Sequence, residues 1–413
     1  MVDCWLPYGD TEIYVSVKLE DYLGTLSLEK KPLAEPIILE NETQTALDNP
    51  VGAPPINELV TPDCTATIAV DGTMNPAIAV EGLKIITSRL VDLIVPRDRV
   101  TIILGNGERE DSGGKILQAI RQDPGLKPIR VLNNTKNSSN HSDLGETVRG
   151  TPIRIRREYL DASLKIALGQ THIDPHTGFK GAFSAIIPGI SSHKTVESNR
   201  KIYFKEEIQL GKIENNPIKE DALEIVETAG IDFALNFAVD YDGTPIGVHA
   251  GSNEETWGKC INDLGARYEI KTSEAADITI ISAGGIYHDF NLYKALWSLE
   301  NAAKVTKKNG TIILAAECSE GLGAEAFTTL SRVREISEFE RRYAYGAEVL
   351  RNLKRITRVN KVVLESTLPN YLTEPLELSS IRTLNEGYQK VINERRGVKT
   401  LIIPYGCTTK IIK

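Results

Sequence analysis

Short runs of apolar, largely β-branched residues alternate along this chain with longer segments in which apolar residues recur every three or four positions. The short runs are typical of buried strands, and the longer spacing is typical of helices that bury one face. When strands and helices alternate, the chain crosses over the sheet to reach each next strand, so neighbouring strands become parallel. The pattern therefore predicts an α/β fold with largely parallel sheets.

The expected elements can be placed along the chain. The candidate strands are 67–70, 101–104, 129–132, 164–168, 278–282, 311–315, 362–364 and 400–403, and the clearest helices are 77–95, 112–121, 292–306 and 335–353. One antiparallel pair is expected as well, because Asp242-Gly243 between the apolar runs 231–239 and 245–250 suits the tight turn of a hairpin.

Length and pattern together predict two domains. A chain of 413 residues suits one large or two ordinary domains, and a fresh β-α-β pattern begins at Asp277, after a helix expected at 254–264. Residues 19–64 interrupt the alternation, and the proline-rich stretch 49–55 suggests an ordered wrap. We place an N-terminal domain at 1–270, possibly rejoined by 398–413, and a C-terminal domain at 271–397, with the two facing an interdomain cleft.

Composition excludes several classes of protein. The 48 basic residues are outnumbered by 56 acidic ones and form no basic run, which argues against nucleic-acid binding. The longest apolar stretches are strand-sized, so no membrane span is expected. The N-terminus shows no secretory signal, which predicts a cytoplasmic protein. The five cysteines are widely spaced and contain no Cys-x-x-Cys pair, so neither a disulfide framework nor a sulfur-ligated zinc site is expected.

The densest concentration of polar chemistry is His172-Ile173-Asp174-Pro175-His176, which directly follows an expected strand. In an extended chain alternate residues face the same way, so His172, Asp174 and His176 share one side. Two imidazoles and a carboxylate suit a general base or a metal site, the base being the better supported of the two. An ordinary loop with hydrogen-bonded histidines remains an equal alternative.

Other polar segments follow strands at the edge where parallel sheets bind ligands. They are 71–76, 105–109, 282–289 and 317–323. Within them Glu108 is a candidate acid or base, although a solvated loop glutamate is equally compatible. Gly284-Gly285 precedes an expected helix, whose backbone N–H groups favour an anion. The glycines do not form the dinucleotide-binding pattern.

These segments resemble, in the same order, the motifs of the nickel-dependent lactate racemase family. The similarity covers essentially the whole chain. It is carried by 6–9, 49–55, 173–176 with 178–179, 188–189 with Thr195, Glu197 and Asn199, 282–285, Asp289, 291–293, and 316–318 with 320–321 and Gly323.

The resemblance implies two α/β domains, a nickel pincer nucleotide, and hydride removal from the 2-carbon of a 2-hydroxy acid between two histidine bases. It places His176 as one base and Glu108 where the other histidine normally stands. It places the cofactor near Gly178, Lys180, Ser184, Gly284, Gly285 and His288, and the substrate near Asn75, Tyr293 and Lys294.

The chain departs from the family at the expected site. Ser184 stands where the family has the lysine that tethers the cofactor, and Arg200 stands where it has the histidine that binds nickel. Arginine has no lone pair to give to a metal, which leaves His193 as the nearby candidate nickel ligand. Asn75 and His288 replace an arginine and a lysine that are expected at the substrate and cofactor.

Three hypotheses follow. In the first, the protein is a racemase or epimerase of a 2-hydroxy acid or related small organic anion, with a non-covalent nickel pincer nucleotide. In the second, it is a nickel-independent enzyme that uses Glu108 and His176, with Lys180 or Arg200, for proton transfer or elimination on a different substrate. In the third, it is a non-catalytic binding protein. The partner in each case is a small organic acid.

Overall fold

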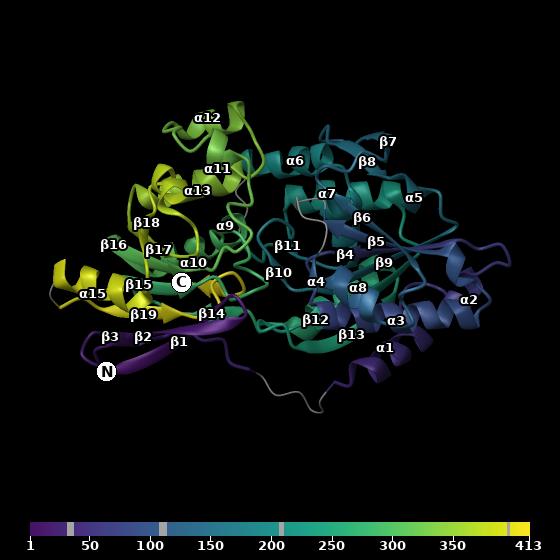
Figure 1. Ribbon diagram of the computed structural model, residues 1–413, viewed down its shortest axis with the longest axis horizontal. Coiled ribbons are helices and arrows are strands. Elements are labelled where there is room, and N and C mark those ends of the chain that lie inside the picture. The colour runs from purple at the N-terminus through teal and green to yellow at the C-terminus, as the bar shows by residue number, and fades with distance from the viewer. Residues whose placement is uncertain (31–36, 107–113, 206–209, 395–396) are drawn as a thin grey trace. The chain divides into compact units, whose positions relative to one another are not determined.

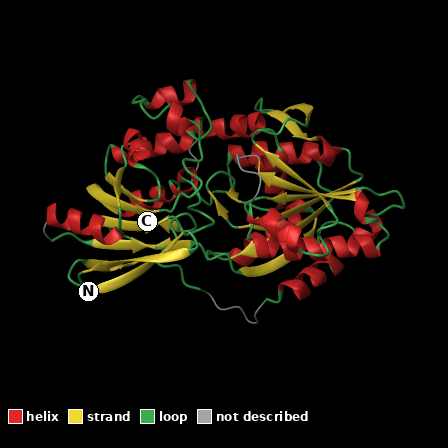
Figure 2. Ribbon diagram, in the orientation of Figure 1, coloured by secondary structure: helices red, strands yellow, loops and turns green. Residues whose placement is uncertain are grey.

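The computed structural model describes residues 1–30, 37–106, 114–205, 210–394 and 397–413. The chain divides into two compact units. Unit 1 comprises residues 1–30 and 266–413, and unit 2 comprises residues 31–265. Helices and strands alternate in both units, so the predicted α/β class with largely parallel sheets is confirmed (Figure 2).

Unit 2 is built on a six-stranded sheet with the order β13-β12-β9-β4-β5-β6. All neighbouring strands are parallel except β12 and β13, which form the hairpin expected at Asp242-Gly243. The strands are β4 (Ala66–Asp71), β5 (Val100–Asn106), β6 (Arg130–Thr135), β9 (Leu164–Thr171), β12 (Phe233–Val239) and β13 (Pro245–Gly251).

Two different layers cover this sheet. Apolar side chains of α1 (Leu39–Asp48), α3 (Pro76–Asp92) and α4 (Lys115–Gln122) share one hydrophobic core with the sheet. A compact segment, 178–190, packs on β4, β5 and β9. It is followed by α6 (His193–Lys201) and α7 (Pro217–Ala229), while α8 (Asn253–Leu264) packs on β12 and β13 (Figure 1). Segment 178–190 is therefore held against the strands whose ends carry the candidate site.

Unit 1 contains a second six-stranded sheet, in which all strands are parallel and the order is β18-β17-β16-β15-β19-β3. The strands are β3 (Tyr22–Thr25), β15 (Ala276–Ser282), β16 (Thr306–Ala315), β17 (Lys361–Glu365), β18 (Ser379–Ile381) and β19 (Thr400–Ile403). The hairpin of β1 (Val2–Tyr8) and β2 (Thr11–Val17) buries Cys4, Leu6, Val15 and Val17 in the core of this unit.

Helices and short strands complete both units. In unit 1 they are β14 (Glu269–Lys271), α9 (Leu292–Ala295), α10 (Ser298–Val305), α11 (Ala326–Thr329), α12 (Ile336–Arg341), α13 (Ala347–Thr357), α14 (Asn370–Thr373), α15 (Leu384–Glu394) and β20 (Lys410–Ile412). In unit 2 they are α2 (Ile56–Leu59), β7 (His141–Glu146), β8 (Pro152–Arg156), α5 (Arg157–Leu160), β10 (Ile173–Asp174) and β11 (Gly178–Phe179).

The division of the chain differs from the domain boundaries expected from sequence. Residues 1–30 belong to unit 1 with the C-terminal half of the chain, and so do residues 398–413. The physical reason is strand pairing: β3 pairs with β19, and β19 pairs with β15. Pairing between strands so far apart in sequence leaves no local pattern.

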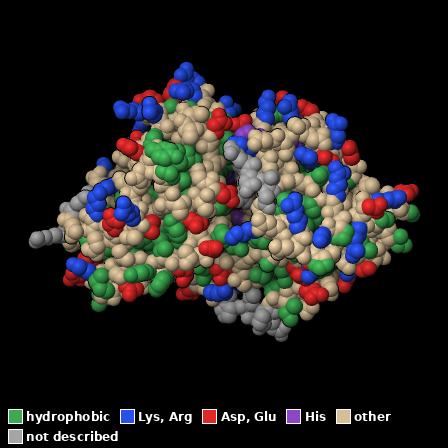
Figure 3. Space-filling view, in the orientation of Figure 1, with side chains coloured by type: hydrophobic (Ala, Val, Ile, Leu, Met, Phe, Trp, Pro, Cys, Tyr) green, Lys and Arg blue, Asp and Glu red, His purple; other side chains and the backbone are tan. Residues whose placement is uncertain are grey.

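Two long expected helices are each interrupted. The span 292–306 forms α9 and α10, and the span 335–353 forms α12 and the start of α13. Gly346 precedes α13 in a left-handed conformation, which a continuous helix cannot contain. No helix in the described part of the chain is long and apolar enough to span a membrane. Acidic and basic side chains are interspersed over the face of the molecule seen in Figure 3.

Candidate active site

A deeply buried charged pair joins the end of β4 to segment 178–190 in unit 2. Lys180 Nζ lies 3.3 Å from Asp71 Oδ2 and donates to Thr73 Oγ1 at 2.7 Å. Only about 5% of either charged side chain is exposed. Asp71 also accepts hydrogen bonds from the Thr73 backbone N–H and hydroxyl. Asp71 and Thr73 thus hold the Lys180 ammonium at the carboxyl edge of the sheet.

The protonation of this pair follows from its surroundings. Burial alone would favour a neutral Asp71, but the Lys180 charge and the two Thr73 hydrogen bonds outweigh burial and hold the pKa of Asp71 below its usual value. Asp71 is therefore an anion at neutral pH, where it neutralises the buried cation.

His172 stays uncharged near this pair. Burial, reinforced by the Lys180 charge, lowers the pKa of His172 to about 4. His172 Nδ1 lies 2.9 Å from the carbonyl oxygen of Ile173, so Nδ1 carries the proton of the neutral ring and Nε2 is the acceptor nitrogen. At neutral pH this imidazole can accept a hydrogen bond, but a pKa of about 4 makes it a weak general base.

His176 is almost fully buried, and its backbone is fixed from both sides. Asp174 Oδ2 accepts from the N–H groups of His176 and Thr177 at 2.9 and 2.8 Å. Asn216 donates to the carbonyl oxygen of His176 at 2.8 Å. Asp174 therefore shapes the turn that presents His176, a structural role that the alternation of His172, Asp174 and His176 did not reveal.

Three other predicted residues of unit 2 have contacts that shape the backbone around them. Asn75 Oδ1 accepts from the Ala77 N–H and so caps α3. The Ser184 hydroxyl is buried and accepts from the Gly181 N–H at 3.4 Å. Gly178 has a φ of +82°, and a β-carbon there would meet the Lys212 carbonyl oxygen at 2.5 Å, so backbone geometry alone requires glycine.

The two remaining candidates in the described part of unit 2 lie on α6. His193 Nε2 is 3.7 Å from Glu197 Oε1, one helical turn away. The guanidinium of Arg200 is buried and donates to Asn199 Oδ1 at 2.9 Å. Asn199 in turn donates to Asp221 Oδ2 on α7 at 2.8 Å. Glu108 lies outside the described residues.

The other predicted residues belong to unit 1. The Gly284-Gly285 turn is closed by the His288 N–H, which donates to the Gly285 carbonyl at 2.8 Å. The Tyr293 hydroxyl donates to the buried carboxylate of Glu348 at 3.1 Å, and the Lys294 backbone N–H donates to Asn291 Oδ1.

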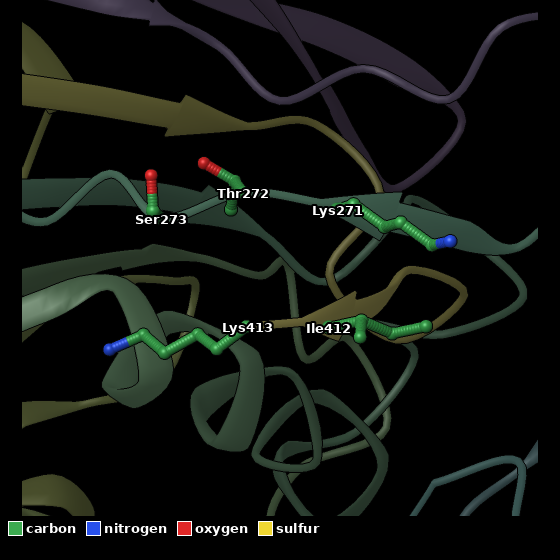
Figure 4. Close-up of a pocket in the computed structure, with 5 residues that line it drawn as sticks. All are labelled: Lys271, Thr272, Ser273, Ile412 and Lys413. Atoms are coloured by element: carbon green, nitrogen blue, oxygen red, sulfur yellow. The ribbon is translucent and has the colours of Figure 1, made fainter.

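A cavity of about 320 Å³ opens elsewhere in unit 1, at the ends of β14 and β20. Figure 4 shows that its two lysines, Lys271 and Lys413, point in opposite directions, while the hydroxyl groups of Thr272 and Ser273 lie apart from both ammonium groups. No residue predicted from sequence lines this cavity, and its side chains do not converge on a point.

Comparisons with known proteins agree with this fold. Family models described as the lactate racemase N-terminal domain and the lactate racemase C-terminal domain match residues 8–211 and 271–409. A lactate racemase from Thermoanaerobacterium thermosaccharolyticum is 27% identical over 79% of this chain and 77% of its own length. A lactate racemase from Lactiplantibacillus plantarum is 25% identical over 98% of this chain and 99% of its own length.

Among solved structures, the lactate racemase apoprotein from T. thermosaccharolyticum superposes with a TM-score of 0.82 at 23% identity, over the full length of both chains. Together the fold and the relatives define an enzyme of the racemase class. More specifically, the chain belongs to the lactate racemase family.

The family resemblance implies a nickel pincer nucleotide, and the donor set of this chain does not fit that group. The resemblance places Arg200 at the position of the nickel ligand, and its guanidinium has no lone pair for a metal and donates to Asn199. The resemblance places Ser184 at the position of the tethering lysine, and its hydroxyl accepts a hydrogen bond from the Gly181 N–H. In the described part of the chain, histidine, cysteine, aspartate and glutamate form no group of three that could hold a metal ion.

Asp71 and Thr73 were not predicted individually as site residues, although the segment 71–76 that contains them was recognised from the sequence. The signal was present in Asp71, a carboxylate placed directly after an apolar strand. Lys180 was assigned to a cofactor, and its pairing with Asp71 spans 109 positions in sequence.

Proposed function

We propose that the protein is a racemase or epimerase of a small organic anion, and that it moves a proton at a carbon next to a carbonyl group without using nickel. The observation that carries the proposal is the buried Lys180 ammonium, fixed by Asp71 and Thr73 at the ligand-binding edge of the sheet. Membership of the lactate racemase family supports the reaction class. The misfit of Ser184 and Arg200 supports a mechanism without the pincer group.

The substrate class follows from the strength of the available bases. Side-chain bases work best with a pKa near the operating pH. The C–H of a plain 2-hydroxy acid, which has only an anionic carboxylate beside it, is far too weakly acidic for such a base. A neighbouring ketone carbonyl acidifies a C–H much more, because it delocalises the charge that deprotonation creates. We therefore assign a carboxylate that has a stereocentre next to a ketone carbonyl.

In this mechanism a base takes the proton of the substrate C–H, and the electron pair of that bond forms the C=C bond of an enolate. The Lys180 ammonium stabilises the negative oxygen electrostatically. Return of a proton to the opposite face gives the other configuration. His176 and Glu108 are the proposed proton carriers on the two faces, and neutral His172 orients the substrate by accepting a hydrogen bond.

A second candidate substrate is a 2-hydroxy acid such as lactate, which is favoured by the names of the two curated relatives. That activity would need a hydride acceptor held by groups other than Arg200 and Ser184. Its specific test is elemental analysis of protein co-produced with the enzymes that make the nickel cofactor. Stoichiometric nickel and lactate racemisation would establish it.

Deuterium exchange in heavy water tests the main proposal. The probes are (S)-3-methyl-2-oxopentanoate, whose C–H is next to a ketone, and (S)-lactate, whose C–H is not. We expect the purified protein to exchange and racemise the oxo acid without nickel. Lack of exchange on the oxo acid, together with nickel-dependent turnover of lactate, would refute the proposal. Tight binding of both probes without exchange on either would indicate a binding protein.

A further inference from the structure

The backbone of Lys180 is held by a residue far away in sequence, Trp257 of α8. The indole N–H of Trp257 donates to the carbonyl oxygen of Lys180 at 2.9 Å, within the buried interior of unit 2. On its other side the Lys180 N–H donates to the carbonyl oxygen of His172 at 2.9 Å. The backbone N–H and C=O groups of Lys180 are therefore both hydrogen-bonded to other parts of the fold.

These two hydrogen bonds are needed to position Lys180, because the backbone next to it has few conformational restrictions of its own. Lys180 lies between Gly178 and Gly181, and glycine restricts its own backbone less than any other residue. Steric restrictions on the neighbouring backbone therefore do not fix the position of the Lys180 α-carbon. The position of its α-carbon, from which the side chain reaches Asp71, depends on tertiary hydrogen bonds.

Trp257 also fills the space that Gly181 leaves. A β-carbon on Gly181 would lie 2.6 Å from Cδ1 of Trp257, so the indole packs where a side chain would otherwise stand. The ring meets Phe183 edge-on, with centroids 5.5 Å apart and planes at 90°. One indole therefore contacts residues 180, 181 and 183 of segment 178–190.

A second contact from the same region supports the segment. Asn236 on β12 accepts from the Ala182 N–H, and its amide donates to the Thr256 hydroxyl at 2.8 Å. Thr256 precedes Trp257 on α8, which begins at a Ser252 cap. The first turns of α8 thus support segment 178–190 directly through Trp257 and indirectly through Asn236.

We propose that Trp257 is the positioning residue for Lys180, and that its indole N–H sets where the Lys180 ammonium lies relative to Asp71 and the substrate. The kinetic part of this inference rests on the proposed function of Lys180, whereas the structural part does not. Misplacement of a reacting group by about 1 Å can cost about a hundredfold in rate, so a backbone anchor is enough to influence turnover.

Trp257→Phe tests the inference, because phenylalanine keeps an aromatic ring beside Gly181 and Phe183 but lacks the N–H. The measurement is the rate at which acetic anhydride acetylates Lys180 in the folded full-length chain, followed by mass spectrometry. We expect acetylation of Lys180 to accelerate about tenfold, the factor that corresponds to loss of one buried hydrogen bond. An unchanged rate would overturn the inference.

Two other lysines in the same sample separate local from global effects. Lys354 is buried and ion-paired with Glu377 in unit 1, and Lys259 is exposed. Both should react as in the wild-type chain, and so should Lys180 in the control Trp5→Phe, which alters an exposed tryptophan. Equal acceleration at Lys354 would mean general unfolding and would count against a positioning role.

The kinetic measurement uses deuterium exchange into (S)-3-methyl-2-oxopentanoate. Trp257→Phe should lower the exchange rate at saturating substrate by about tenfold to a hundredfold with little change in KM. In a Lys180→Met background the same substitution should cause no further loss, because the two residues act through one group. A further loss there would overturn the inference, whereas full activity of Lys180→Met alone would refute the proposed role of Lys180.

Discussion

The Lys180 ammonium and the Asp71 carboxylate lie 3.3 Å apart and are both almost completely removed from solvent, although 109 residues separate them in sequence. A buried ion pair of this kind stabilises the fold little more than apolar residues in the same space would, because the cost of removing both charges from water offsets much of their attraction. Its position at the carboxyl end of β4 is consistent with the role in substrate binding that we propose for Lys180.

Asp71→Asn should destabilise unit 2, because it leaves the Lys180 cation buried without its counter-ion. Breaking one side of a buried pair typically costs about 3 to 5 kcal/mol of unfolding free energy. Urea denaturation followed by circular dichroism measures this loss. The double variant Asp71→Asn, Lys180→Met should be more stable than Asp71→Asn alone, and a further loss in the double variant would contradict the pairing.

His176→Ala should lower turnover by about a hundredfold or more, the usual scale of general acid or base catalysis. The measurement is deuterium exchange on the oxo acid probe. His249→Ala is the matched control, because His249 is partly exposed and pairs with Asp263 at 2.6 Å on the β13 and α8 surface. Undiminished exchange in His176→Ala would remove this residue from the mechanism.

The double variant Ser184→Lys, Arg200→His should bind more nickel than the natural chain. The substitutions supply an amine and an imidazole, and imidazole is a good ligand for nickel. Elemental analysis after co-production with the cofactor-making enzymes measures bound nickel directly. Arg200→Lys is a suitable control, because it keeps a cation at this position. Equal nickel content in the natural chain and the double variant would contradict our account of the donor set.

Unit 1 should lose stability as pH rises from about 5 to 7, because of Glu365 at the end of β17. Burial raises the pKa of this carboxyl to about 7. Below the unfolded pKa of about 4.5 both states are protonated, and between that value and 7 the unfolded state ionises first, so rising pH favours unfolding. Above pH 7 the penalty is constant.

Melting temperatures between pH 5 and 8 test this pH dependence. Glu365→Gln cannot ionise, so its melting temperature should fall less over this range than that of the natural chain. The exposed Glu374→Gln should behave like the natural chain. Parallel curves for the natural chain and Glu365→Gln would show that Glu365 titrates normally.

The periodicity of the sequence was sufficient to predict most strands of the two six-stranded sheets. The run 164–168 and the run 311–315 lie within strands β9 and β16, and the Asp242-Gly243 turn joins β12 to β13. These elements could be predicted because burial between two layers requires apolar residues at local, regular positions. Membership of the lactate racemase family could also be inferred, because its short motifs occur in the same order along this chain.

The roles of Asp174 and Asn75 could not be predicted from the same pattern. Alternation placed Asp174 beside the two histidines as a chemical group, but its carboxylate is used to close the turn before His176. Asn75 was expected at the substrate, and in the structure its side chain caps α3. A polar side chain next to a helix or turn can form hydrogen bonds with the backbone or with a ligand, and the residue type does not distinguish these two roles.

The sequence by itself determined the fold class, the family, and the presence at position 200 of arginine, which cannot bind a metal, because each depends on residue type or local spacing. Only the tertiary structure decided that residues 1–30 belong to unit 1, that Lys180 pairs with Asp71, and that Trp257 holds the Lys180 backbone. These relationships join segments 77 or more residues apart, and contacts at that separation arise from packing, which leaves no periodic trace in the chain.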